Sequence, residues 1–275
     1  MTRDFQPDQD PAGRLRSVYE SEGGSGSVFS TKVADYLRSR PDYPQALFDV
    51  LAVSCRLAEG SVVADVGAGT GLLTKGLLQQ GYRVIVVEPS SEMRQAADRL
   101  LSGNKSYSSV AGSAEAMPLE PASADLITAA QAFHWFDVPR ARTEFLRVLT
   151  PQGQVALIWN DRVPDDPLNL ALDEISNEFG GAKRAAQIAH EKERSDVPRF
   201  FGTAQPVQFV WPNSQFLDEE GLMALVFSRS YIPGRTSTDA PKVANRISDL
   251  FRRFMTNGTV EITYRTVAFI GRPAG

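Results

Sequence analysis

Apolar and polar positions alternate along this chain in two ways, and the alternation predicts a layered α/β fold. Short apolar runs that are typical of buried strands lie near 62–66, 84–88, 107–110, 124–130 and 154–159. Segments with helical spacing lie between them, at 72–80, 90–101 and 138–149. The last helix has Asp137 as its predicted cap and ends before Pro151. Strands that alternate with helices across short turns form a parallel sheet with right-handed crossovers.

The N-terminal region has a different pattern. Residues 1–28 are polar and rich in Gly, Ser, Asp and Pro, which predicts a flexible arm whose 21–27 segment is a linker. Two helices are then expected at 33–37 and 45–57. The segment between them holds two prolines and is not expected to be helix interior.

The C-terminal region is too long for a simple crossover. Roughly 100 residues separate the fifth strand from a last strand at 260–270. Helices are expected there at 168–179, 182–193, 219–229 and 240–255, with a strand at 207–211. We therefore predict a binding core with an N-terminal helical lid at 29–160, an insertion at 161–257 that holds one core strand and covers the active site, and a final core strand at 258–275.

Polar residues and glycines gather where the predicted strands end. The first strand runs into Gly67, Gly69 and Gly71, and the second ends in Glu88. Carboxyl ends of parallel strands meet at one edge of a sheet, and ligands bind there. The candidate ligand-binding residues that fall at such ends are Asp65, Glu88, Ser113 and Gln131. This layout indicates a nucleotide-type cofactor site.

The spacing of the glycines separates two cofactor classes. A dinucleotide site needs Gly-x-Gly-x-x-Gly, and the third position holds Leu72. Asp65 would also repel a pyrophosphate, which disfavours a nicotinamide oxidoreductase. S-adenosylmethionine has no phosphate: Asp65 suits its ammonium, directly or through water, and Glu88 suits its ribose hydroxyls. The glycine turn lets the backbone approach the methionine part.

Three further segments, 111–118, 125–136 and 145–154, complete a known pattern. Over roughly 29–160 the chain resembles the class I S-adenosylmethionine-dependent methyltransferases, most closely the type 11 small-molecule group with its relatives of trans-aconitate methyltransferase. The resemblance implies a Rossmann-like, seven-stranded, mostly parallel sheet with an antiparallel last strand and a helical insertion or cap. Many relatives have Asp where this chain has Ser113, so adenine would be bound here by a hydroxyl or a backbone carbonyl.

The resemblance also implies a set of cofactor-binding residues. In the N-terminal element, Arg40 would pair with the methionine carboxylate and Tyr36 would lie near the sulfonium. Met93 would neighbour the adenine, although simple packing is an alternative for all three. The full set is Tyr36, Arg40, Asp65, Gly67, Gly69, Gly71, Glu88, Pro89, Met93, Ser113, Ala114 and Gln131.

Methyl transfer needs alignment and, for some acceptors, removal of a proton. His134, just after the fourth strand, is the candidate general base, and a place in the aromatic wall 133–136 is the alternative. Arg162 and Arg229 are candidate clamps for a carboxylate, and a surface salt bridge is the alternative for Arg162. The predicted substrate residues are Trp135, Phe136, Asn160, Arg162, Arg229 and Tyr231. An adenine pocket or ordinary core packing is the alternative for Trp135 and Phe136, and helix-end packing is the alternative for Arg229 and Tyr231. A cavity with an arginine would indicate an acid as acceptor, and an aromatic box with a carboxylate would indicate an amine.

The composition of the chain disfavours several classes of binding partner. The net charge is −4 and the pI about 5.4, without a basic stripe, which disfavours nucleic acid. Cys55 is the single cysteine and there are two histidines, so neither a disulfide nor a metal site is expected. Apolar runs fall far short of the ~20 residues that cross a bilayer, and no signal peptide is apparent.

We therefore expect a cytoplasmic enzyme, a monomer or homodimer, that uses S-adenosylmethionine to methylate an oxygen or nitrogen of a small molecule. The alternatives are a protein of the same fold that only binds the cofactor, and a non-methylating enzyme such as a cyclase. The acceptor itself is not indicated by the sequence.

Overall fold

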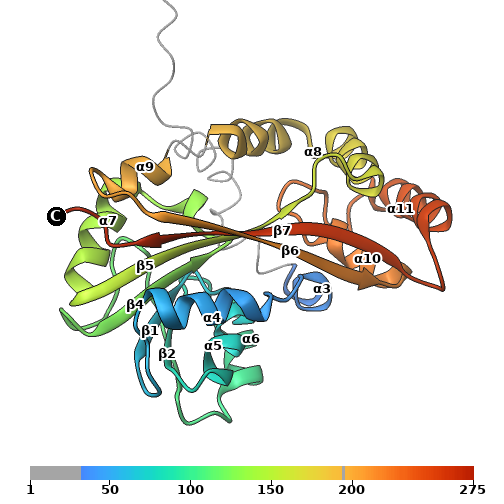
Figure 1. Cartoon of the computed structure of the whole chain (residues 1–275). Helices are drawn as coiled ribbons and strands as arrows, with labels where there is room; N and C mark the ends of the chain where they lie inside the picture. The colour runs from blue at the N-terminus through green and yellow to red at the C-terminus, as the bar shows by residue number, and fades with distance from the viewer. Residues whose placement is uncertain (1–31, 194–195) are drawn as a thin grey trace, which may run out of the picture.

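The computed structural model describes residues 32–193 and 196–275, and one seven-stranded sheet runs through it (Figure 1). Its order is β3-β2-β1-β4-β5-β7-β6, and β7 is antiparallel to both β5 and β6. The strands are β1 Val62–Val66, β2 Arg83–Val87, β3 Tyr107–Val110, β4 Ala124–Ala130, β5 Leu149–Arg162, β6 Val207–Leu217 and β7 Val260–Gly271. The predicted mostly parallel sheet with an antiparallel last strand is confirmed. The predicted N-terminal arm, 1–28, lies outside the described residues.

Helices cover both faces of the sheet and continue beyond its end (Figure 1). The N-cap residue predicted for the helix after the fourth strand is confirmed. The Asp137 carboxylate accepts a hydrogen bond from the Arg140 amide at 3.2 Å. The helices are α3 Val33–Ser39, α4 Gln45–Ser54, α5 Leu72–Gln79, α6 Ser91–Leu101, α7 Val138–Val148, α8 Pro167–Glu193, α9 Asp196–Phe201, α10 Glu219–Phe227 and α11 Ala240–Phe254, with a 3-10 turn, η1, at Phe133–Trp135. Among the described residues, none of these helices is both long and apolar enough to cross a bilayer.

Two strands are longer than the sequence pattern predicts. β5 and β6 extend past the sheet core because both pair with β7. β6 pairs along nearly all of β7, as far as Leu217↔Val260, and β5 pairs with the C-terminal part of β7, from Arg162↔Tyr264 onward. The pairing partner is distant in the chain, so local alternation does not reveal it. The extension carries α8, α10 and α11 away from the parallel half of the sheet (Figure 1).

The helices expected at 168–179 and 182–193 are both present, and they share the label α8 because they are joined at a kink, where the backbone of Gly181 is not helical (φ 52°, ψ −141°). One helical segment differs from prediction. The short helix α9 is not predicted, since six residues give too little periodicity to identify. Its Phe200 and Phe201 rings are fully buried beside Phe145 of α7, with the Phe200 and Phe145 centroids 5.4 Å apart.

The apolar core is divided into three clusters, and one of them belongs to the extension. α7 and α9 pack on one face of the sheet, and α4 and α5 pack on the other. A separate cluster joins α8, α10 and α11 to the far ends of β6 and β7 around Leu222, Val243 and Ile262. Within the region after β5, α8, α10 and α11 therefore share a separate core with the far ends of β6 and β7, and we call these three helices the cap.

α3 is attached to this cap. The Lys32 ammonium donates to the backbone oxygens of Arg229 and Ile232, each at 2.6 Å. Arg235 pairs with Asp35 of α3 at 2.8 Å. These contacts, together with packing of α3 on α10, hold Tyr36 and Arg40 between the cap and the carboxyl edge of the sheet.

Candidate functional site

Two adjoining cavities lie at the carboxyl edge of the sheet. The smaller, about 220 Å³, lies over the ends of β1 to β4, and the larger, about 440 Å³, lies under the cap. Three residues line both: Tyr36 of α3, Gln131 after β4 and Trp135 of η1. Two ligands bound side by side would therefore meet at these three side chains.

The smaller cavity gathers nine of the twelve residues predicted to bind a cofactor. They are Tyr36, Gly67, Gly69, Glu88, Pro89, Met93, Ser113, Ala114 and Gln131. They come from strand ends that are distant in sequence, and the parallel sheet brings these ends together. Arg40, Asp65 and Gly71 do not line this cavity.

The glycine turn after β1 has positive φ at all three glycines, 65° at Gly67, 59° at Gly69 and 81° at Gly71. A Cβ on Gly67 would lie 2.7 Å from the Ala132 Cβ, whereas a Cβ on Gly69 would meet nothing within 4 Å. Gly69 thus leaves open space where the turn faces the cavity. Gly71 has a packing role at the start of α5, where a Cβ would lie 2.6 Å from a Leu101 methyl group.

Glu88 is held in place by the backbone on both sides. Its Oε2 accepts from the Gly69 amide and its Oε1 from the Ser90 amide, each at 2.9 Å. Burial raises the pKa of the carboxyl, and the two amides oppose that rise. The carboxylate therefore fixes the glycine turn against the start of α6, and Glu88 also lines the smaller cavity.

Asp65 differs from the expectation of a cavity-facing acid. It is fully buried behind the turn, where its oxygens accept from the Thr74 hydroxyl at 2.6 Å and the Thr128 hydroxyl at 2.8 Å. Burial raises its pKa to about 6, against the pull of these hydrogen bonds. Because α5 and β4 both supply a hydroxyl, the carboxylate is bound by the chain itself.

Gln131 marks the boundary between the two cavities. Its φ is 55°, which is uncommon for a residue with a side chain, and its amide donates to the Ile158 oxygen at 2.9 Å. The side-chain Nε2 donates to the Asn160 backbone oxygen at 3.1 Å. Strained backbone held by neighbouring strands is common at functional sites, and here it places Gln131 in both cavities.

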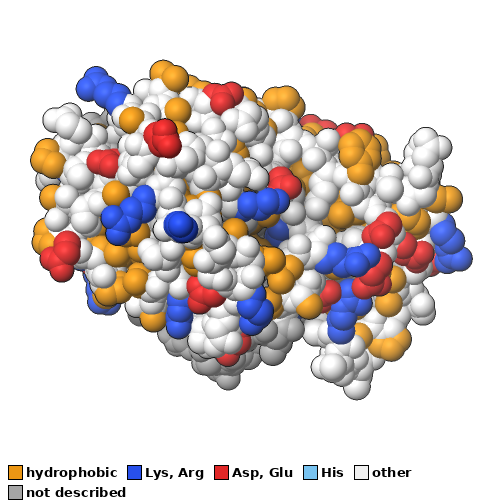
Figure 2. Space-filling model, turned by 90° about the horizontal axis from the view of Figure 1, so that it is seen from below, with side chains coloured by type: hydrophobic (Ala, Val, Ile, Leu, Met, Phe, Trp, Pro, Cys, Tyr) orange, Lys and Arg blue, Asp and Glu red, His pale blue; other side chains and the backbone are white. Residues whose placement is uncertain are grey.

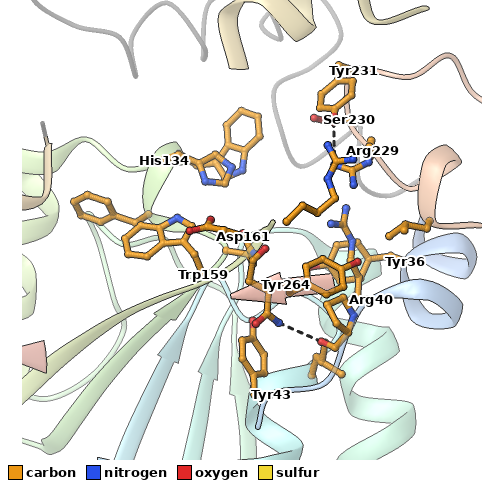
Figure 3. A pocket seen from close by; sticks show the side chains of 18 of the residues that line it. Tyr36, Arg40, Tyr43, His134, Trp159, Asp161, Arg229, Ser230, Tyr231 and Tyr264 are labelled. Carbon is orange, nitrogen blue, oxygen red and sulfur yellow. Dashed lines mark hydrogen bonds between the residues drawn. The ribbon is translucent and has the colours of Figure 1, made fainter. Parts of the chain in front are cut away.

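The larger cavity contains most of the predicted substrate residues. They are Trp135, Asn160, Arg162, Arg229 and Tyr231, joined by His134. Figure 3 shows His134 on one side of this cavity and Arg229 with Tyr231 on another. Two residues line a different cavity from the rest of their predicted group. Phe136, grouped with the substrate residues but also compatible with an adenine pocket, lines the smaller cavity because the chain turns back after η1 toward Gly67. Arg40, expected with cofactor, lines the larger one, with its guanidinium over the Tyr36 ring at 4.6 Å.

Asn160 has structural partners for its whole amide. Its Oδ1 accepts from the Thr266 hydroxyl at 2.6 Å and from Asn213 at 3.3 Å. Its Nδ2 donates to the Pro41 oxygen at 3.5 Å. The side chain therefore ties β5 to β7, to β6 and to the segment after α3, although it also borders the cavity.

The larger cavity also contains residues that the sequence did not single out as site residues. The most prominent are Trp159, Asp173, Arg184 and Tyr264. Tyr264 lies on β7 opposite Arg162 and is 5% exposed, and its hydroxyl has no hydrogen-bond partner in the described part of the chain. In the sequence it looks like any aromatic residue of a strand, and only the β5–β7 register places it beside Arg162.

Charge is unevenly paired in this cavity. Arg162 and Arg184 both form ion pairs with Asp173. Burial, followed by the nearby positive charge of Arg229, lowers the pKa of Arg162. Burial raises the pKa of the Tyr264 phenol, and the charges of Arg229, Arg40 and Arg162 oppose that rise. Three guanidinium groups thus act electrostatically on one phenol, and two of them, those of Arg40 and Arg229, are labelled with Tyr264 in Figure 3.

The chain is similar in sequence to known methyltransferases. A family model described as a methyltransferase domain matches residues 64–157. An uncharacterized methyltransferase of Mycobacterium tuberculosis is 36% identical over 224 residues, which are 81% of this chain and 84% of that protein. An uncharacterized methyltransferase-like protein of Schizosaccharomyces pombe is 31% identical over 246 residues, 88% of this chain and 94% of that protein.

A solved structure shares the fold. It is that of a putative type II methyltransferase from Anaeromyxobacter dehalogenans, with a TM-score of 0.63 and 23% identity. The match covers 85% of this chain and 97% of that one. At this identity the match is evidence for the fold alone.

Proposed function

The chain belongs to the class I S-adenosylmethionine-dependent methyltransferases, and from this premise we propose that it transfers a methyl group to an oxygen or nitrogen of a small molecule. The observation that carries the proposal is the pair of cavities that meet at Tyr36, Gln131 and Trp135. One cavity suits the cofactor and the other suits the acceptor. Their junction is where the transferred methyl group would lie.

The smaller cavity has the groups that the cofactor needs. The open space at Gly69 admits the methionine part close to the backbone, and the fixed carboxylate of Glu88 can accept hydrogen bonds from two ribose hydroxyls. Met93 and Phe136 offer apolar surface, and the Ser113 hydroxyl and Ala114 lie beside it for the adenine. Asp65 contributes negative charge from behind the turn, toward the ammonium.

The junction would align the reacting atoms. S-adenosylmethionine, when bound, supplies a methyl group whose bond to sulfur breaks as the bond to the acceptor forms, with the electron pair left on sulfur. The chain's part is to hold the acceptor in line and to exclude water, and such alignment supplies roughly 7–11 kcal/mol of barrier lowering. Tyr36 and Trp135 present aromatic faces there, which favour a nearby sulfonium.

His134 stays the candidate for proton removal. It lines the larger cavity, and its ring lies 5.1 Å from that of Trp135. For a hydroxyl, phenol or amine acceptor it would take the proton, whereas for a carboxylate it would form part of the wall. The role of His134 therefore depends on whether the acceptor has a proton to lose.

A small acceptor is favoured by the shape and charge of the molecule. A cavity of about 440 Å³ under a cap is of a size typical for small ligands. On the face seen in Figure 2, Lys and Arg side chains are interspersed with Asp and Glu and form no continuous basic stripe of the kind that binds nucleic acid. The closer kinship with trans-aconitate methyltransferase is part of the proposal, and the sequence resemblance supports it.

Calorimetric titration with S-adenosylmethionine and with S-adenosylhomocysteine tests the proposed function. We expect saturable one-to-one binding in the micromolar range, and release of S-adenosylhomocysteine when a panel of small acids, phenols and amines is supplied. A folded protein that binds neither compound at millimolar concentration would refute the cofactor assignment. Binding without methyl release to any acceptor would refute the transferase assignment.

A further inference from the structure

Two arginines of the larger cavity have no carboxylate partner among residues 32–193 and 196–275. Arg229 donates to the Tyr231 hydroxyl at 2.9 Å, and Arg40 lies 3.5 Å from the Ser228 backbone oxygen. The other two arginines, Arg162 and Arg184, share Asp173. Arg40 and Arg229 are half-buried, and burying a guanidinium group without a counter-charge is energetically unfavourable. An anion bound on this side of the cavity would supply the missing negative charge.

The Tyr264 hydroxyl is the second, independent observation. The side chain is 95% buried, it lines the cavity, and its oxygen has no hydrogen-bond partner in the described structure. The Arg40 Nε is likewise buried without a partner. Such groups are rare in folded proteins and call for an explanation. Both are donors, and a bound group that only accepts hydrogen bonds would satisfy both.

We propose that the methyl acceptor carries a carboxylate, which is held between Arg229, Arg40 and the Tyr264 hydroxyl. The inference rests on the proposed function, since it assigns the larger cavity to the acceptor. Figure 3 shows the three side chains on one side of the cavity: Arg229 comes from the turn after α10, Arg40 from the end of α3, and Tyr264 from β7. The same cavity already shows this kind of recognition, because the Asp173 carboxylate is held by two arginines.

The charge balance also selects against amines. The lining holds four arginines and three aspartates, and Asp173 is already engaged by two of the arginines. A protonated amine placed here would meet unpaired guanidinium groups as well as the sulfonium of the donor. A carboxylate would be attracted by these guanidinium groups and by the sulfonium. Phe133, Trp135 and Trp159 leave an aromatic surface for the rest of the acceptor.

Matched pairs of probes test the charge requirement. Phenylacetate and phenylacetamide have nearly the same shape, and only the first is an anion; 3-phenylpropionate and its amide form a second pair. Binding is followed by tryptophan fluorescence in protein saturated with S-adenosylhomocysteine, since Trp135 and Trp159 both line the cavity. We expect each acid to bind at least roughly 10-fold more tightly than its amide. Equal affinities, or tighter binding of the amides, would overturn the proposal.

Variants locate the binding groups. Arg229→Gln should abolish the preference for the acid, and Tyr264→Phe should reduce acid affinity roughly 5–10-fold. The matched control is Arg246→Gln on α11, because Arg246 is half-exposed and pairs with Glu178, and neither residue lines a cavity. The control should keep the full preference. An unchanged preference in both cavity variants would place the anion elsewhere and refute the assignment.

Two readouts keep failure of this inference separate from failure of the proposed function. S-adenosylhomocysteine affinity, measured by calorimetry, should stay within about 2-fold in all three variants, because none of these side chains lines the smaller cavity. Tyr264→Phe removes a hydroxyl without a partner, so it should unfold at the same or a higher denaturant concentration than the parent. Were Arg229→Gln to unfold, Tyr264→Phe alone would decide the question.

Discussion

The smaller cavity is built from strand ends and one backbone turn, whereas the larger one is built from side chains of α3, α8, α10, η1 and the extended strands. In the first, glycines and backbone amides fix the geometry, as where the Gly69 and Ser90 amides hold Glu88. In the second, arginines and tyrosines face open space and pair only in part. The first arrangement suits a ligand common to a whole family, and the second suits a ligand particular to this chain.

The largest effect on cofactor affinity is expected from Gly67→Ala, which would change the backbone of the turn that lines the smaller cavity. The new Cβ would lie 2.7 Å from the Ala132 Cβ at a φ of 65°. The overlap costs about 1–3 kcal/mol beyond the backbone penalty, so affinity for S-adenosylhomocysteine should fall roughly 10–100-fold in calorimetry. Gly60→Ala is the control, with φ 82° and nothing within 4 Å of the added carbon. If both variants bind alike, the turn does not shape the cofactor site.

A somewhat smaller effect is expected from Glu88→Gln. A glutamine offers one acceptor oxygen where two amides now donate, which leaves one buried amide without a partner. The loss of about 1–3 kcal/mol should weaken S-adenosylhomocysteine binding roughly 5–100-fold in the same titration. The control is Glu178→Gln, a half-exposed partner of Arg246 on the cap. Unchanged affinity in Glu88→Gln would remove this residue from the cofactor site.

Asp65, buried behind the smaller cavity, should make the stability of the protein depend on pH. Burial raises its pKa from 3.8 to about 6, so the folded state binds this proton more tightly than the unfolded state does. The contribution to stability is most favourable below the unfolded pKa and is lost as pH rises through the folded pKa. Between about pH 5 and about pH 7.5, stability should fall by roughly 1–2 kcal/mol relative to Asp65→Asn.

Urea unfolding of both proteins at the two pH values measures this difference. Asparagine cannot ionise, and it keeps an acceptor for one of the two threonine hydroxyls. Parallel stability profiles of the two proteins would mean that Asp65 is ionised in both states throughout this range.

The smallest effect is expected from His134→Ala in the larger cavity. An essential general base contributes about 100–10,000-fold to the rate, whereas a carboxylate acceptor has no proton to remove. If the acceptor is an acid, turnover with that acid should therefore fall by less than about 10-fold. The measurement is the rate of S-adenosylhomocysteine release at saturating acid. A loss of 100-fold or more would identify His134 as a base and would argue for a hydroxyl, phenol or amine acceptor.

The contrast between the cavities also explains what the sequence could predict. The glycine turn and Glu88 are local signals, since a few neighbouring residues determine each, and the parallel sheet places them together. Tyr264 and Arg184 carry no local signal, because their positions depend on the β5–β7 register and on the path of α8. The cavities that Arg40 and Phe136 line are hard to predict for a related reason, since one turn of chain decides which cavity each side chain borders.

Asp65 and Asn160 show a second limit of the sequence. Both have the chemistry of a binding residue and both lie at strand ends, yet the chain itself uses their polar atoms. Which polar groups are free for a ligand is decided by tertiary neighbours such as Thr74, Thr128 and Thr266. The sequence therefore predicts the location of the site better than it predicts which polar atoms face the ligand.

The central claim is that two ligands meet at Tyr36, Gln131 and Trp135, with the methyl donor on the side of the smaller cavity. A crystal structure with S-adenosylhomocysteine and phenylacetate bound tests this most directly. We expect the ribose hydroxyls at Glu88, the sulfur beside Tyr36 and Gln131, and the carboxylate of the acid between Arg229 and Tyr264. S-adenosylhomocysteine in the larger cavity, or its sulfur directed away from the junction, would contradict the account.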